Sequence, residues 1–248
     1  MKPSAQPLRS TTESGDYSPP DIRRTSIWLG VAGFATVIAA QVFAVATSPA
    51  ERDMGHLQKI MYVHVPAAWM TFLAFFVVLV FSVRYMWRRN ENDDLLAAAA
   101  AEVGAVFNGL TLLLGMIWGR PAWGVWWVWD AQLTCALLLL ALFLAVVMLQ
   151  TALDDARRAD RAAAVLVLCG LIALPVVYAS MVRWGVAPPD TLLAPAMRPG
   201  TMDTLLAGML VMGAGLAAYT VAAALTRLRT MILERERRSE WAAHLAGD

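Results

Sequence analysis

The stretch AQLTCALLLLALFLAVVML at residues 131–149 is the clearest indication of the fold, because it is as long as a membrane-spanning helix and contains no charged side chain. The apolar core of a bilayer needs about 20 consecutive apolar residues in helical form. A lone strand would leave its backbone N–H and C=O groups unpaired in lipid. The stretch therefore predicts a membrane-spanning helix.

Apolar stretches of similar length occur at five more places, at residues 27–47, 65–83, 95–117, 162–182 and 204–225. Among them only 95–117 carries a charged residue, Glu102. The whole chain is 59% hydrophobic and 16% charged, against about 45–50% and about 25% in soluble domains. The sequence predicts an all-α polytopic membrane protein with six transmembrane helices. A soluble six-helix bundle is disfavoured because almost no polar face would remain for water.

The basic residues predict the direction of the six spans. If the spans alternate, 15 of the 20 Lys and Arg residues fall on one side. Basic loops favour the cytoplasmic side, so both termini are predicted to be cytoplasmic. Residues 1–25 are predicted to be a disordered cytoplasmic tail, 26–226 the six-helix domain and 227–248 a cytoplasmic C-terminal tail. The loops 48–64, 118–130 and 183–203 then face outward, which in a bacterial inner membrane means the periplasm.

The outward loop WGRPAWGVWWVWD at residues 118–130 holds five of the ten tryptophans of the chain. An aromatic belt at the membrane surface explains scattered tryptophans, but this density favours a ligand platform. Glycines permit tight turns, and the four indoles of the platform would hold a flat conjugated ligand by stacking and area burial. They are Trp123, Trp126, Trp127 and Trp129. Asp130 directly precedes a span and is predicted to be its N-cap.

A histidine at the outer end of the second span is the other candidate. In the stretch IMYVHVPAAW at residues 60–69, Pro66 fits the first turn of a helix, which places His64 at the outer lip. Such a histidine is commonly a hydrogen-bonded packing residue, but beside an aromatic platform it is also a suitable axial ligand for haem iron. Zinc or copper would require several His or Cys ligands together. The two cysteines, Cys135 and Cys169, are predicted to be buried apolar residues.

These two motifs resemble the cytochrome c maturation protein C family, also called haem exporter protein C, a tryptophan-rich group of haem-handling membrane proteins. The resemblance runs from about residue 25 to 240, with a weaker match at residues 195–198. It implies that haem b is bound as cargo at the outer face and passed to a periplasmic haem chaperone. It also implies partners, namely an ATP-binding-cassette ATPase and small membrane subunits of a cytochrome c maturation complex.

The resemblance assigns His64 as the first axial ligand of haem iron. It assigns haem contact to the residues of the tryptophan motif, which are Trp118, Gly119, Trp123, Gly124, Trp126, Trp127, Trp129 and Asp130. Arg120 or Arg183 would pair with a haem propionate. No enzymatic chemistry is expected, because the sequence has no Ser–His–acid arrangement and no phosphate-binding loop.

The sequence departs from the family pattern in two places. The family carries a second histidine in the loop before the last span, and residues 183–203 contain none. The second axial ligand is left open among several residues or a water-bound position; the residues are Met181, Met197, Met202, Tyr178 and His56. In addition, Gln132 stands where the family usually has an arginine.

Two other functions stay open at this point. A permease subunit of an ATP-driven exporter would need a polar path through the membrane, for which Gln41, Glu102 and Asn108 are the candidates. For the last two, pairing between neighbouring helices is the favoured interpretation. A structural assembly subunit would tolerate the loss of both His64 and the tryptophans.

Overall fold

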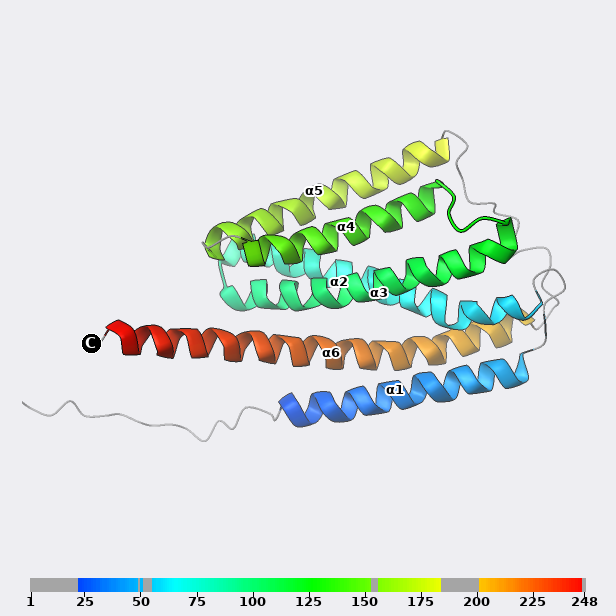
Figure 1. Ribbon diagram of the computed structural model, residues 1–248, viewed down its shortest axis with the longest axis horizontal. Helices are drawn as coiled ribbons and strands as arrows, with labels where there is room; N and C mark the ends of the chain where they lie inside the picture. Colours follow the sequence, from blue (N-terminus) through cyan, green and yellow to red (C-terminus); the bar gives the residue numbers. More distant parts are fainter. Residues whose placement is uncertain (1–21, 49, 51–54, 153–155, 184–200, 247–248) are drawn as a thin grey trace, which may run out of the picture.

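The computed structural model describes residues 22–48, 50, 55–152, 156–183 and 201–246. Within these ranges the chain forms six long α-helices and one short 3-10 helix (Figure 1). In chain order they are α1 (Ile22–Thr47), η1 (His56–Ile60), α2 (Met61–Arg88), α3 (Glu91–Trp123), α4 (Ala131–Ala152), α5 (Ala156–Arg183) and α6 (Thr201–Ala246).

Each of the six predicted spans lies inside one of these helices, in the predicted order. Five helices, α1, α2, α3, α4 and α6, are long and apolar enough to cross a membrane. The sixth predicted span, 162–182, lies within α5, which packs beside α4. The prediction of an all-α polytopic membrane protein is confirmed.

Successive helices run in opposite directions, so the connections gather at two ends of the bundle (Figure 1). We call the end where α3 finishes and α4 begins the loop end, and the opposite end, where α1 begins and α6 finishes, the tail end. The described helix ends that border the three segments predicted to face outward all lie at the loop end. The predicted C-terminal tail 227–248 is helical as far as Ala246, because α6 continues past the other helices at the tail end.

Three apolar cores hold the helices together, and the smallest joins α1, α2 and α6 around Tyr62 and Leu205. The largest joins α2, α3, α4 and α5, with Phe143 and Val78 almost completely buried at its centre. The second joins α2, α3 and α6 around Met212 and Ala67. The helix pair α1 and α6 therefore lies against a four-helix group rather than inside it.

Glycines let α6 approach its neighbours closely. A Cβ atom on Gly33 of α1 would lie 2.8 Å from the carbonyl oxygen of Gly215 in α6. A Cβ atom on Gly208 would lie 2.4 Å from Cε1 of Tyr62 in α2. Small residues at such crossings are typical of helix packing in membranes, where close backbone approach replaces the hydrophobic effect.

The outer faces of the helices are apolar and exposed. Phe34 and Phe43 of α1 are 59% and 67% exposed, and Phe72 and Phe76 of α2 are 65% and 60% exposed. Large aromatic side chains that point away from the bundle at this frequency match a surface in contact with lipid.

The start of α2 differs from the prediction. The helix begins at Met61, directly after η1, so Pro66 lies inside it rather than in its first turn. The prediction for Pro66 is wrong because the preceding residues already wind into η1. The pyrrolidine ring is buried between helices, and its missing N–H costs one backbone hydrogen bond. His64 lies in the first turn of α2, at the loop end, as predicted.

Candidate functional site

The tryptophan motif begins inside a helix. The sequence predicted a loop over 118–130, but α3 continues to Trp123 and contains Pro121. The fixed φ of proline is compatible with a helix, which loses only one backbone bond. Gly124 ends α3 with φ at 78°, a left-handed conformation that glycine adopts without steric cost. Its N–H donates to the carbonyl of Arg120 at 3.0 Å.

The side chain of Arg120 adds a second hydrogen bond at this helix end. Its guanidinium Nη1 donates to the carbonyl oxygen of Gly124 at 2.5 Å. The remaining guanidinium N–H groups stay at the surface, because this side chain is exposed. Arg120 therefore both fixes the turn after α3 and presents positive charge at the loop end.

The first indole pair is packed on a glycine. The rings of Trp118 and Trp123 meet edge to face, with centroids 5.1 Å apart and an interplanar angle of 86°. A Cβ atom on Gly119 would lie 3.1 Å from Cε3 of Trp123. Gly119 is thus required for close packing of the Trp123 ring against α3, not for the tight turn that the sequence suggested.

The second indole pair lies in the loop between α3 and α4. Trp127 and Trp129 also meet edge to face, at 5.5 Å and 75°. Trp126 and Trp129 are 55% and 66% exposed. Of the four indoles predicted to form a platform, Trp127 and Trp129 are therefore tilted against each other, and Trp126 and Trp129 offer open apolar surface.

Asp130 ends the loop by capping α4. Its Oδ1 accepts a hydrogen bond of 2.7 Å from the backbone N–H of Leu133, and the residue is buried. The predicted N-cap is confirmed. The cap fixes where the loop rejoins the bundle, and so where the preceding tryptophans lie.

His64 packs against α3 one helical turn before the tryptophans. A Cβ atom on Gly115 would lie 3.3 Å from Cε1 of the imidazole, so the ring occupies the space that a side chain at Gly115 would take. Gly115 precedes Trp118 by three residues, about one turn of helix. Gly115 was not recognised as a site residue from the sequence, although its spacing from Trp118 places both on one side of α3.

Several buried polar atoms at this end have no hydrogen-bond partner. In the part of the chain that the structure describes there are seven such side-chain atoms, and four belong to the candidate site. They are Nδ1 of His64 and Nε1 of Trp118, Trp123 and Trp127. A buried unpaired donor costs roughly 1–3 kcal/mol, and an indole N–H can only donate. The cluster suits a ligand that brings hydrogen-bond acceptors.

The other predicted site residues are more scattered. Arg183 is exposed at the last position of α5, and His56 is exposed at the start of η1; both elements end at the loop end (Figure 1). Met197 lies outside the described residues. Tyr178, Met181 and Met202 lie in helices whose side chains at these positions are outside the described part. The second axial ligand is therefore still a prediction with several candidates.

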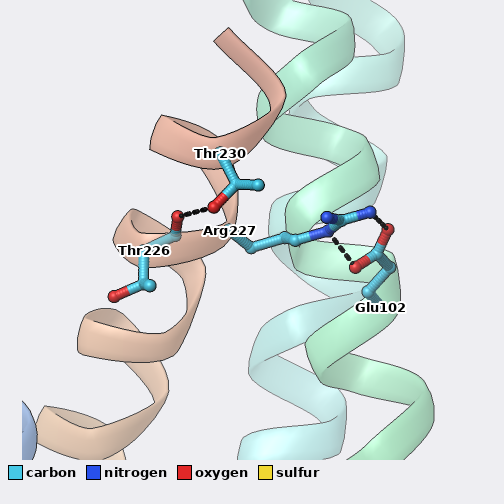
Figure 2. A network of polar contacts seen from close by, with 4 residues as sticks. All are labelled: Glu102, Thr226, Arg227 and Thr230. Atoms are coloured by element: carbon cyan, nitrogen blue, oxygen red, sulfur yellow. Dashed lines mark hydrogen bonds and ion pairs between the residues drawn. The ribbon is translucent and has the colours of Figure 1, made fainter. Parts of the chain in front are cut away.

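Two polar residues of the spans, Glu102 and Asn108, are paired between helices. Arg227 of α6 donates to both carboxylate oxygens of Glu102 in α3, at 2.5 and 2.8 Å, and Figure 2 shows the two side chains meeting. Asn108 of α3 donates to the carbonyl of Ala136 in α4 at 3.0 Å. The prediction that Glu102 and Asn108 each pair with a neighbouring helix is confirmed. Glu102 links α3 to α6, and Asn108 links α3 to α4.

Comparison with known proteins gives consistent matches over most of the chain. A family model described as Heme exporter protein C matches residues 19–243. The Heme exporter protein C of Escherichia coli strain K12 is 36% identical over 225 residues, 88% of each chain. That of Bradyrhizobium diazoefficiens is 39% identical over 217 residues, 86% of this chain and 80% of its own. A ccmC-like mitochondrial protein of cytochrome c biosynthesis from Marchantia polymorpha is 33% identical over 162 residues, 65% of this chain and 68% of its own.

Proposed function

The chain belongs to the Heme exporter protein C family, and we propose that it holds haem at the loop end and passes it to a haem chaperone for c-type cytochrome maturation. The observation that carries this proposal is the position of His64. Its ring packs on Gly115, one helical turn from a tryptophan cluster that contains three unpaired indole N–H groups.

The residues at the loop end fit haem as a cargo. The porphyrin is flat and apolar, and the exposed indoles of Trp126 and Trp129 offer surface to bury it. Its iron takes imidazole as an axial ligand, which His64 supplies. Its two propionates are hydrogen-bond acceptors, which the guanidinium of Arg120 and the unpaired indole N–H groups can satisfy.

Transfer requires binding that is specific but reversible. A single imidazole ligand on α2 and an exposed indole surface meet this requirement better than an enclosed cavity would. Because Gly115 has no side chain, the His64 ring packs directly on the backbone of α3. The Asp130 cap and the Arg120 turn keep the tryptophan loop in place during release. The chain itself would form no covalent bond to haem.

The remaining predicted partners follow from the family. We expect the chain to work with an ATP-binding-cassette ATPase and small membrane subunits, in a bacterial inner membrane with the loop end in the periplasm. The uneven distribution of Lys and Arg supports this direction. The pairing of Glu102 with Arg227 and of Asn108 with Ala136 argues against a permease path through these residues.

The proposal is tested on the full chain purified with haem supplied. Trp126 and Trp127 are replaced together by alanine, and retained haem is measured from the Soret absorbance per mole of protein. Trp28 and Trp87, which are 65% and 87% exposed and lie in α1 and α2 toward the tail end, give the matched double variant. Haem should be lost only from the first variant. Equal haem occupancy in the two double variants would indicate that the tryptophan loop is only an aromatic belt at the membrane interface.

A further inference from the structure

A groove with basic and apolar walls lies on the outside of α4 and α5 near the tail end. It has a volume of about 560 Å³ and is lined by Leu149, Arg158, Arg161, Ala162, Val165, Leu166 and Cys169. Six of these residues belong to α5 and repeat at three- and four-residue intervals, so they form one stripe along that helix. The groove is at the opposite end of the bundle from the haem site proposed above.

The charge in the groove is confined to its tail-end part. Arg158 and Arg161 lie in the first two turns of α5, and the lining contains no acidic side chain. The first turn of α5 also has no acidic residue, so the positive end of the helix dipole adds to the arginines. Within the described residues Arg161 is exposed and forms no ion pair. This part of the groove attracts an anion.

The rest of the groove is apolar and faces outward. From Arg161 to Cys169 the stripe rises about 12 Å along α5. Val165 is 46% exposed, and the neighbouring apolar faces of the bundle are exposed as well. A ligand that fits both parts has an anionic group at one end and a hydrocarbon chain at the other.

We propose that this groove binds one anionic phospholipid, with its phosphate on Arg161 and an acyl chain along Val165 and Cys169. Basic clusters at the ends of membrane helices attract anionic lipid with about 1 kcal/mol per Lys or Arg, a factor of about five in binding. The apolar stripe adds a chain contact that a soluble phosphate cannot make. The site would fasten the α4 and α5 pair to anionic lipid at the tail end.

The experiment measures lipid that stays bound to the full chain. The protein is equilibrated with equal amounts of phosphatidylglycerol and phosphatidylcholine, and retained lipid is counted by native mass spectrometry. We expect one phosphatidylglycerol on the wild type. Arg161→Gln should reduce its retention about fivefold, while Arg229→Gln, an exposed basic residue of α6 outside the groove, should not.

A second pair of variants tests the apolar half. Val165→Phe fills the groove and should displace the lipid, whereas Val221→Phe on α6, at the same 46% exposure, should not. Glycerol 3-phosphate, which has the headgroup without chains, should not compete. The proposal is overturned by equal retention of the two lipids, by equal effects of the two arginine variants, by equal effects of the two valine variants, or by competition from glycerol 3-phosphate.

Discussion

Replacing Gly115 tests whether the position of His64 matters for haem. The contact distance from a new Cβ atom to Cε1 of His64 would be 3.3 Å, against about 3.5–4.0 Å for carbon atoms at optimal separation. Alanine therefore requires a shift of a few tenths of an ångström. Valine adds two more carbon atoms and has to displace the imidazole.

The substitution that is expected to weaken haem binding is not expected to lower folding stability. Glycine in a helix interior is about 0.8–1.0 kcal/mol less favourable than alanine, so Gly115→Ala should fold at least as well as the wild type. Gly109 lies in the same helix, and a Cβ atom there would meet no neighbouring side chain or helix within 4 Å. Gly109→Ala and Gly109→Val are therefore matched controls for backbone propensity alone.

The assay is haem titration followed at the Soret band, with far-ultraviolet circular dichroism as the measure of folding. We expect Gly115→Val to weaken haem binding by on the order of tenfold or more, with Gly115→Ala between it and the wild type. Binding sites need their contacting groups to be placed within about 0.5 Å, so a His64 imidazole displaced by about 1 Å should bind haem iron much more weakly. Wild-type affinity and spectrum in Gly115→Val, with unchanged helicity, would refute the role given to His64.

Three predictions concern stability, measured as the free energy of unfolding in detergent by titration with a denaturing detergent. Glu102→Gln should cost about 0.5–1 kcal/mol, because the pair is partly exposed; no coupling with Arg227→Gln in a double-mutant cycle would contradict this. Asp130→Ala should cost about 1 kcal/mol through the lost N-cap, and Asp130→Asn should recover most of it. Gly33→Ala should cost about 1–3 kcal/mol, because the new atom meets the backbone of Gly215; an unchanged value would disprove the close crossing.

The spans were predictable from the sequence because their chemistry is local. Uncharged stretches of about 20 residues have few alternatives to a helix in lipid, and all six predicted spans lie within observed helices. The cap at Asp130 and the interhelical pairing of Glu102 were predictable for the same kind of reason. A cap depends on the adjacent backbone, and a charged residue in a span needs a partner.

The end of α3 was not predictable in the same way. Taken alone, Gly119 and Pro121 indicate a turn, yet both lie inside α3. Gly119 instead leaves room for the ring of Trp123 to pack against the helix. The contact of His64 with Gly115 depends on how α2 and α3 cross, which a single sequence does not encode in its local pattern. The edge-to-face arrangement of the indoles also follows from tertiary packing rather than from their number.

Magnetic circular dichroism of the haem-loaded full chain identifies the axial ligands of the iron, and so tests the role of His64 without an intermediate step. His56, exposed in η1 at the loop end and a candidate for the second axial ligand, is replaced in parallel. We predict a histidine-ligated signature in the wild type and in His56→Ala, and its loss in His64→Ala. An identical spectrum in His64→Ala and the wild type would contradict the proposed haem site.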